Sequence, residues 1–332
     1  MTNQMNLQLT KELLKRNTDE SADHFLNDVL SGLKSNPKHL SSKYFYDKNG
    51  DELFQKIMAM PEYYLTRCEL DIFKNKTEEI AKGIKADIES FDLIELGAGD
   101  AMKSTYLLKY LNQQNTDFTY MPIDISGNIL SVLEKNLKKQ LPELDIISLE
   151  GEYFQMLEKA MRLSSRRKVI MFLGGNIGNM SKKEATEFCV NIHKVLHKED
   201  IVLIGFDLKK NPYTVLNAYS DKSGITAAFN LNLLSRINRE LGADFNTDHF
   251  EHYESYDPIT GACRSFLISL KEQTVTLAGE RIFFEENEVI DMEVSQKFSK
   301  REIQELAEES GFTIAGEIAD SKGWFIDSIW MA

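Results

Sequence analysis

The sequence predicts an α/β protein built on an open, doubly wound parallel sheet with an inserted α+β subdomain. Two observations carry this prediction. From residue 91 to residue 208, short apolar runs alternate with amphipathic segments of helical period. The runs are apolar throughout instead of alternating with polar residues, which is typical of strands that helices cover on both faces.

The expected elements follow one another with few residues between them. Strands are expected at 91–96, 118–124, 144–150, 168–174 and 201–208. Helices are expected near 103–111 and at 127–140, 154–163 and 181–197. A helix at 299–310 and two closing strands, FTIAGEIA and GWFIDSIWM, add an antiparallel hairpin to the sheet.

The remaining segments have a different texture. Apolar positions recur every three or four residues up to Asn36-Pro37, which predicts an N-terminal helix ending there. Aromatic residues crowd around turn residues in 43–64, as in a satellite core or a tyrosine-lined pocket. Residues 212–250 look helical, and 262–295 look like successive antiparallel strands. We therefore expect a substrate-binding domain of residues 1–67 plus 210–297 and a cofactor-binding domain of residues 68–209 plus 298–332.

Composition limits the partners. The chain has 332 residues, with 39 Lys and Arg against 52 Asp and Glu, which gives a formal charge of −13. A nucleic-acid surface needs clustered basic residues, so we expect no nucleic-acid partner. No run reaches the roughly 18 apolar residues that span a bilayer, and the N-terminus lacks the apolar stretch of a signal peptide. Three separated cysteines, Cys68, Cys189 and Cys263, fit a reducing compartment. We expect a soluble, cytoplasmic monomer without membrane contact.

The segment ELGAGD, residues 95–100, joins the first expected strand to the first helix. Glycines at such a turn let the backbone approach a bound nucleotide or amino-acid tail, although many parallel sheets use a glycine turn for packing alone. The next glycine of a dinucleotide fingerprint would fall at Met102, so that fingerprint is broken. Asp124 ends the second strand, where a carboxylate can bind two ribose hydroxyls, while Ser126 is better placed to cap the next helix. Together these features favour a ribose-bearing cofactor.

This order of motifs resembles the class I S-adenosylmethionine methyltransferases, whose sheet is Rossmann-like. A more specific resemblance, to the histidine-specific Nα-methyltransferases of ergothioneine synthesis, extends from residue 40 to residue 299. The matching segments are LSSKYFYDKNGDELFQKI, MPEYYLTR, LIELGAGDAMKS, MPIDIS, FLGGNIGNM, AYSDKSGITAAFN, INRELGADF and MEVSQKFS. MPEYYLTR and GITAAFN are not expected of methyltransferases in general, which makes this resemblance strong.

The resemblance implies a set of cofactor-binding residues. Gly97, Lys103 and Asp124 fall on positions that bind S-adenosylmethionine, with Lys103 paired to its carboxylate. Glu152 and Tyr153 fall beside the adenine, where a histidine-methylating relative has Asp-Phe. The change keeps an acceptor and an aromatic face. Without the resemblance, Lys103 is best interpreted as a solvated helix residue.

The resemblance also implies a pocket for the acceptor amino acid. The family's histidine-binding positions fall on Tyr63, Asn179, Tyr219, Glu293 and Ser295, and residues near the same pocket fall on Tyr46 and Phe54. Asn179 and Tyr219 are able to donate hydrogen bonds to a carboxylate. Glu293 and Ser295 stand two apart on one expected strand, and an acid with a hydroxyl suits a ring with two nitrogens. Without the resemblance, Glu293 is a solvent-facing strand residue and Asn179 a cap.

The implied activity is S-adenosylmethionine-dependent methylation of the α-amino group of L-histidine, up to Nα,Nα,Nα-trimethylhistidine (hercynine). In-line displacement from a sulfonium needs approach geometry and a neutral amine. A free α-amino group has a pKa of about 8, so a group must accept its proton. Tyr46, Tyr63 or a water beside them are the candidates.

Other functions compete with this hypothesis. A relative could methylate another aromatic amino acid such as tryptophan, since Ser265 is small and leaves room for a larger ring. Glu293 with Ser295 favours the imidazole, because an indole offers one donor alone. A cofactor-binding protein without catalysis and a nicotinamide oxidoreductase are further alternatives, and Met102 argues against the latter.

Several other clusters are interpreted as structural. His193 and His197 stand four apart on one helix face without an accompanying acid or cysteine, so we expect no metal site. His249 and His252 are expected in a polar turn or helix end. There is no GxSxG segment for a hydrolase. Arg166, Arg167 and Lys168 are expected in a solvated turn.

Overall fold

The structure is a computed structural model that describes residues 23–85 and 90–332 and divides into two compact units. Unit 1 comprises the described residues up to Tyr63, together with Pro212–Asp257 and Cys263–Val294. Unit 2 comprises the described part of Tyr64–Asn211, together with Pro258–Ala262 and Ser295–Ala332. The division of labour between a cofactor-binding and a substrate-binding domain stays a prediction.

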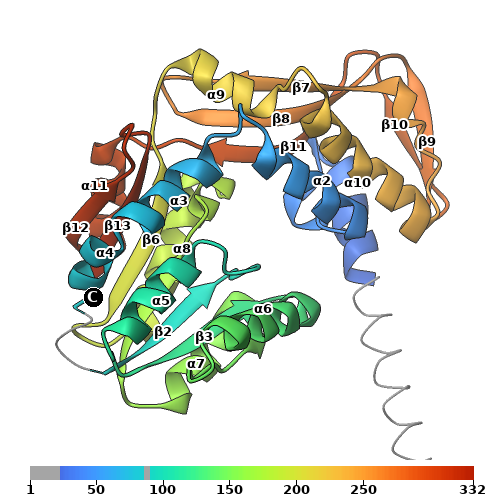
Figure 1. Cartoon of the computed structure of the whole chain (residues 1–332). Coiled ribbons are helices and arrows are strands. Elements are labelled where there is room, and N and C mark those ends of the chain that lie inside the picture. Colours follow the sequence, from blue (N-terminus) through green and yellow to red (C-terminus); the bar gives the residue numbers. More distant parts are fainter. Residues whose placement is uncertain (1–22, 86–89) are drawn as a thin grey trace, which may run out of the picture. The chain divides into compact units, whose positions relative to one another are not determined.

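Unit 2 is built on a seven-stranded sheet in the order β12-β13-β6-β5-β2-β3-β4 (Figure 1). The strands are β2 (Phe91–Leu96), β3 (Phe118–Asp124), β4 (Leu149–Glu150), β5 (Arg167–Phe172), β6 (Ile201–Asp207), β12 (Thr313–Ala319) and β13 (Phe325–Met331). Strands β2 to β6 run parallel, and β13 pairs antiparallel with both β6 and β12. Every residue of β2, β3 and β6 is buried, as expected for strands covered on both faces. The predicted α/β fold class is confirmed.

Helices cover both faces of this sheet (Figure 1). They are α3 (Leu65–Asn75), α4 (Thr77–Gly83), α5 (Ser104–Gln113), α6 (Gly127–Gln140), α7 (Tyr153–Leu163), α8 (Lys182–Val195) and α11 (Lys300–Glu309), with the short 3₁₀ helix η2 (Asn176–Asn179) after β5. Apolar residues of α7, α8 and α11 pack against the strands in one core cluster, while α3, α4 and α5 contact one another. Ser126, Ser181 and Ser299 cap α6, α8 and α11 by accepting backbone N–H groups, and these caps set where the helices begin.

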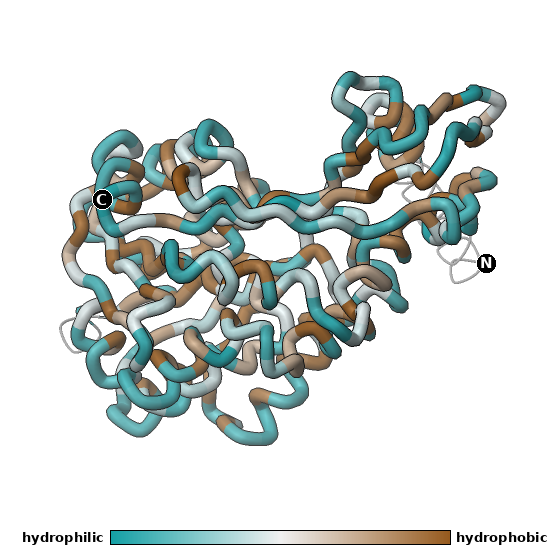
Figure 2. Tube along the Cα trace, turned by 90° about the horizontal axis from the view of Figure 1, so that it is seen from above, coloured by the Kyte–Doolittle hydropathy of each residue, from teal (hydrophilic) through white to brown (hydrophobic). Residues whose placement is uncertain are grey.

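Unit 1 combines helices with a small sheet and a hairpin. Residues 23–34 are helical, followed by η1 (Ser42–Tyr44), α2 (Lys48–Ala59), α9 (Pro212–Tyr219), α10 (Ile225–Leu241) and η3 (Thr247–His249). The strands β1 (Lys38–His39), β11 (Val289–Gln296), β8 (Ala262–Ser269) and β7 (Phe250–Tyr256) form a sheet in the order β1-β11-β8-β7, and β9 (Gln273–Leu277) pairs with β10 (Glu280–Phe284). Figure 2 shows that the outer turns of the trace are mostly hydrophilic.

The structure differs from the expectations between residues 43 and 64, where aromatic residues around turns were expected. Helix α2 occupies most of that stretch, and α3 and α4 follow it in a segment for which no element was expected. Asp47 begins α2 by accepting a hydrogen bond from the Gly50 amide at 2.7 Å. The expected helix before Asn36-Pro37 is present from residue 23, and its apolar positions at residues 13 and 14 lie outside the described residues. Strand β7 was not expected either.

The expectation that Arg166, Arg167 and Lys168 form a solvated turn is wrong for Arg167 and Lys168, which are the first two residues of β5. Lys168 lies in β5 with 2% of its side chain exposed, and its ammonium is 2.8 Å from the Asp92 carboxylate. Asp92 and Lys168 are partners in the parallel register of β2 and β5. A carboxylate that stands 76 residues away in the chain is what permits the burial of this lysine.

Three further features concern burial. The thiols of Cys68, Cys189 and Cys263 are buried and form no disulfide. Burial raises the pKa of Cys68 and of Cys189 to about 12. Across residues 23–85 and 90–332, the structure contains no helix that is both long and apolar enough to cross a membrane.

Candidate active site

The glycine turn after β2 lies at the edge of the sheet where the parallel strands end. Gly97 has a φ of +71° and donates its backbone N–H to the Ile123 carbonyl at 2.9 Å, so the turn folds over the end of β3. A Cβ atom at Gly97 would lie 2.7 Å from the Tyr153 hydroxyl. Glycine is therefore required here both for the left-handed backbone and for the close approach of Tyr153.

Asp124 joins the glycine turn to the start of α6. One carboxylate oxygen of Asp124 accepts from the Gly99 amide at 3.1 Å and the other from the Ser126 amide at 3.0 Å. The Ser126 hydroxyl accepts from the Ile129 amide at 3.3 Å, so the expectation that Ser126 caps the helix is confirmed. The structure thus brings Gly99 and Asp124 together at the ends of neighbouring strands.

Glu152 and Tyr153 stand at the start of α7, with Glu152 exposed at the N-cap position. Burial and the negative charges of Asp124 and Glu152 raise the pKa of Tyr153 to about 12. The hydroxyl therefore keeps its proton at neutral pH and remains a hydrogen-bond donor. Gly97, Asp124 and Tyr153, three of the residues expected at the cofactor, lie together.

Lys103 precedes α5 and forms an ion pair with Glu69 of α3. Glu69 is 1% exposed, and both of its oxygens accept from the Gly174 amide, at 2.8 and 2.9 Å. Glu69 was not expected at the site from the sequence. Its position in the sequence could have revealed it, because Glu69 is an acid among Leu65, Cys68 and Ile72 on the buried face of α3. An amphipathic helix normally has apolar residues on that face.

Glu95, the first residue of the ELGAGD segment, is also buried. Burial raises its pKa to about 7, against the lowering effect of hydrogen bonds from Tyr120 and Ser104 and of the charge on Lys103. The Tyr120 hydroxyl donates to Glu95 at 2.5 Å. This end of β2 therefore holds a carboxyl group that changes its charge near neutral pH.

In unit 1, four residues that the resemblance placed in or near the acceptor pocket form an aromatic cluster. The ring of Tyr63 lies 5.9 Å from Tyr219 and 6.5 Å from Phe54, and Phe54 lies 5.5 Å from Tyr46. Phe229 of α10 packs edge-on against Tyr46 at 5.8 Å. Tyr46 is 44% exposed, while Tyr219 is buried, so the cluster extends from the interior to the surface of unit 1.

In unit 2, Asn179 and Ser295 lie on neighbouring segments. Asn179 is exposed at the end of η2, and a Cβ atom at the preceding Gly178 would lie 2.7 Å from the Gln296 carbonyl oxygen. The 3₁₀ turn therefore packs on the end of β11. Ser295 accepts a hydrogen bond from the buried Lys297 ammonium at 2.8 Å. Glu293 is half-buried on β11, two residues before Ser295.

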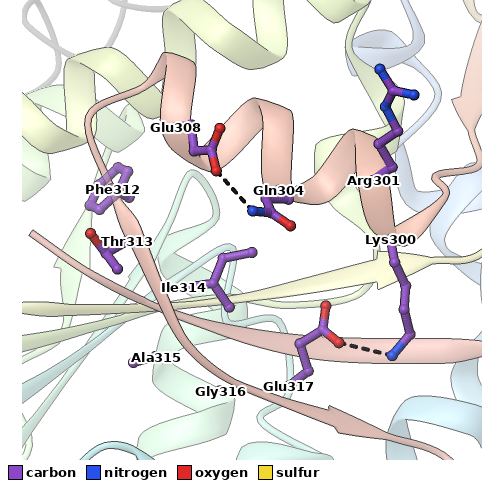
Figure 3. Close-up of a pocket in the computed structure, with 10 residues that line it drawn as sticks. All are labelled: Lys300, Arg301, Gln304, Glu308, Phe312, Thr313, Ile314, Ala315, Gly316 and Glu317. Carbon is purple, nitrogen blue, oxygen red and sulfur yellow. Dashed lines mark hydrogen bonds and ion pairs between the residues drawn. The ribbon is translucent and has the colours of Figure 1, made fainter.

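A cavity of about 760 Å³ opens between α11 and β12, at the far edge strand of the sheet (Figure 3). Its polar side chains pair with one another, Lys300 with Glu317 and Gln304 with Glu308, each at 2.9 Å. None of the expected cofactor or acceptor residues lines it. This cavity is therefore not the candidate active site.

The histidines do not form a metal centre in the part of the chain that the structure describes, where no three His, Cys, Asp or Glu side chains are grouped to hold an ion. The expectation that His252 lies in a polar turn or helix end is wrong, since it is a largely buried residue of strand β7. Its ring is 2.6 Å from the Ser265 hydroxyl, and Ser265 donates to Asn230 at 3.2 Å. Ser265, expected to leave room for a larger ring, is thus part of a buried polar network.

The chain is similar to known proteins over most of its length. Residues 25–332 match the family described as histidine-specific, S-adenosylmethionine-dependent methyltransferases. The histidine N-alpha-methyltransferase of Mycobacterium tuberculosis is 34% identical over 84% of this chain and 86% of its own length. Ergothioneine biosynthesis protein 1 of Schizosaccharomyces pombe is 29% identical over 84% of this chain and 37% of its own length. The 4-dimethylallyltryptophan N-methyltransferase easF of Claviceps purpurea is 24% identical over 87% of this chain and 89% of its own length.

Proposed function

Because the chain belongs to the family of histidine-specific, S-adenosylmethionine-dependent methyltransferases, we propose that it transfers methyl groups to the α-amino nitrogen of L-histidine. The enzyme is an S-adenosylmethionine-dependent N-methyltransferase. The end product we propose is Nα,Nα,Nα-trimethylhistidine. The observation that carries the proposal is the match over residues 25–332 together with the meeting of Gly97, Asp124 and Tyr153 at the edge of the sheet.

The residues at this edge fit the cofactor. S-adenosylmethionine supplies, when bound, a methyl group on a cationic sulfonium. The left-handed glycine turn offers backbone without side chains, and Asp124 offers carboxylate oxygens for the ribose. Tyr153 presents an aromatic ring beside them, with Glu152 next to it for the adenine. Lys103, whose side chain is 21% exposed, is the cation for the carboxylate.

The acceptor must reach the methyl group as a neutral amine. An α-ammonium group has a pKa of about 8, so each methyl transfer needs a proton acceptor beside the nitrogen. We assign this role to the hydroxyls of Tyr46 and Tyr63, each taking the ammonium proton as it passes its own proton to water, because both belong to the aromatic cluster of unit 1. Asn179 and Tyr219 are assigned to the amino acid's carboxylate. Glu293 and Ser295 are assigned to its imidazole, one accepting and one able to donate.

A second candidate acceptor is an amino acid with a larger aromatic ring. The relative from Claviceps purpurea carries a tryptophan derivative in its name. Ser265 is smaller than most residues that pack against a ring, which would leave space for an indole. Against this candidate, Ser265 already exchanges hydrogen bonds with His252 and Asn230, and a ring placed there would displace a buried polar network.

The test is a screen of the twenty amino acids with labelled S-adenosylmethionine and mass detection of the products. We expect histidine to be the preferred acceptor, with one, two and three labels appearing in sequence. Preferred labelling of tryptophan would establish the second candidate instead. Labelling of no amino acid would contradict both.

The assignment of Glu293 to the imidazole has its own test. In Glu293→Ala the Kd for histidine should rise at least about tenfold, the effect of losing a hydrogen bond to a charged group, while the Kd for S-adenosylmethionine changes by less than about twofold. Glu251→Ala, which removes an exposed acid from β7, is the matched control and should change neither constant. Equal losses for both ligands in Glu293→Ala would contradict the assignment.

A further inference from the structure

A buried carboxylate, Glu69, links two loops at the edge of the sheet where the cofactor residues lie. It binds the Lys103 ammonium, at the end of the loop that follows β2, and the Gly174 amide, in the loop that follows β5. The first loop carries Gly97, and the second leads to Asn179. Glu69 itself belongs to neither loop, since it lies on α3.

The sheet makes room for this carboxylate. Gly205 of β6 lies beneath it, and a Cβ atom at that position would collide with an oxygen of Glu69. Gly205 is the register partner of Asp327 on β13. The Glu69 carboxylate therefore occupies space that the side chain of any larger residue at position 205 would fill.

A second buried acid, Asp327, lies next to the Glu69 carboxylate. It is fully buried, and neither of its oxygens has a hydrogen-bond partner among the described residues when it is written as a carboxylate. Burial and the adjacent negative charge of Glu69 hold the pKa of Asp327 well above its usual range. A protonated Asp327 is a donor that can face the Glu69 carboxylate.

We propose that Glu69 is a positioning residue for S-adenosylmethionine, acting through Lys103. By holding the Lys103 ammonium at one place beside the glycine turn, Glu69 preforms a contact for the cofactor's carboxylate. Its hydrogen bond from the Gly174 amide keeps the loop after β5, which leads to Asn179, at the same edge of the sheet. This inference rests on the proposed cofactor role of Lys103. It adds Glu69 to the site, a residue that belongs neither to the ELGAGD segment nor to the expected acceptor positions.

The chain provides a matched control for this arrangement. Asp92 and Lys168 form another buried carboxylate–lysine pair of unit 2, 2.8 Å apart, near the first residues of β2 and β5 and so at the opposite end of the strands. Asp92→Asn should weaken folding without changing how the folded protein binds the cofactor. Glu69→Gln should change cofactor binding, because a neutral amide oxygen holds an ammonium more weakly than a carboxylate does.

The test is isothermal titration of S-adenosylmethionine into the full-length protein with no amino acid present, for Lys103→Met, Glu69→Gln, the double variant Glu69→Gln/Lys103→Met and Asp92→Asn. We expect Lys103→Met and Glu69→Gln each to raise the Kd at least about tenfold. The double variant should be no weaker than Lys103→Met, within about twofold, and Asp92→Asn should match the unaltered protein. At saturating cofactor, kcat of Glu69→Gln should fall by less than about threefold.

Each outcome decides a separate point. A normal Kd in Lys103→Met would contradict the cofactor role of Lys103, and with it that part of the proposed function. A normal Kd in Glu69→Gln alone, or a double variant tenfold weaker than Lys103→Met, would overturn the positioning role. If Glu69→Gln does not fold, the double variant, which leaves no cation unpaired, still compares directly with Lys103→Met. The acceptor is absent throughout, so an error about histidine leaves these results unaffected.

Discussion

Two of the lysine–carboxylate pairs of unit 2, Lys168 with Asp92 and Lys103 with Glu69, lie at opposite ends of the same sheet and are built differently. Lys168 is enclosed, because its ammonium donates to Asp92 at 2.8 Å, to the Arg166 carbonyl at 2.7 Å and to the Ser164 carbonyl at 2.9 Å. Lys103 keeps 21% of its side chain exposed and pairs with Glu69, itself 1% exposed. The Lys168 ammonium therefore makes its hydrogen bonds inside the protein, whereas the Lys103 side chain stays partly exposed to solvent.

This difference separates a structural pair from a functional one. Burying an ion pair costs desolvation energy that only good geometry and complete hydrogen bonding repay, and a cation whose hydrogen bonds are all made inside the protein has none left for a ligand. A pair with an exposed cation keeps bonding capacity for a ligand. The parallel topology explains why the Lys103 pair is the one available to a ligand. Ligands bind at the carboxyl ends of parallel strands, where Lys103 lies, and Lys168 lies at the opposite ends.

The largest expected effect comes from removing each cation in turn. Lys168→Met leaves the buried Asp92 carboxylate with the Ser164 hydroxyl as a donor but without its cation, and should lower the free energy of unfolding by about 3–5 kcal/mol. Lys103→Met should cost about 2 kcal/mol, because the Lys103 side chain is already 21% exposed and the Gly174 amide still binds Glu69. Urea denaturation measures both. Recovery of most of the loss in Asp92→Leu/Lys168→Met would confirm that the unpaired charge is the cause, and equal losses in the two single variants would contradict the comparison.

The buried carboxyl of Glu95, near the end of β2, should make the free energy of unfolding depend on pH, and Asp92, near the start of β2, provides the comparison. The pKa of Glu95, about 7 in the folded protein, stands above the ordinary 4.5, so between these values the folded state holds a proton that the unfolded chain releases. The free energy of unfolding should therefore fall by about 3 kcal/mol as the pH rises from about 4.5 to about 7, and change no further from this group above that range.

Chemical denaturation across this pH range measures the slope. Glu95→Gln should remove the contribution, whereas Asp92→Asn, at the other end of the strand, should retain it. An unchanged slope in Glu95→Gln would show that the buried carboxyl is not its source.

The smallest expected effect on stability concerns the glycine turn. Gly97→Ala and Gly224→Ala both place a side chain at a positive φ, of +71° and +73°, and each should lose about 1 kcal/mol of unfolding free energy. A Cβ at Gly224 meets nothing within 4 Å, whereas one at Gly97 meets the Tyr153 hydroxyl. Only Gly97→Ala should therefore raise the Kd for S-adenosylmethionine, by at least about tenfold; a similar rise in Gly224→Ala would point to general strain.

The sequence predicted the fold where local chemistry decides it. The run FDLIEL became β2 without a change of bounds, and the helix 127–140 kept both ends because Ser126 caps it. Helix α2 was missed because its Asp47 cap lies among aromatic residues that suggested a loop. Lys168 was misjudged because its partner, Asp92, is distant in the chain, and no local pattern pairs two such residues.

The candidate site was predicted in part by position and in part by resemblance. The glycine turn and Asp124 follow from where strands end. The acceptor residues were placed by resemblance alone, since nothing in the spacing of Tyr46, Tyr63 and Tyr219 indicates the ring cluster that they form with Phe54. Glu69 was not found by either route, because its role depends on contacts with Lys103 and Gly174 that only the folded chain makes.

The central claim, methylation of the α-nitrogen of histidine, is tested most directly by tandem mass spectrometry. Purified protein is incubated with L-histidine and S-adenosylmethionine carrying a deuterated methyl group, and the product ions are fragmented to locate each label. The account predicts up to three labels, all on the α-nitrogen and none on the imidazole ring. Label on the ring, or no label on histidine while another amino acid is methylated, would contradict it.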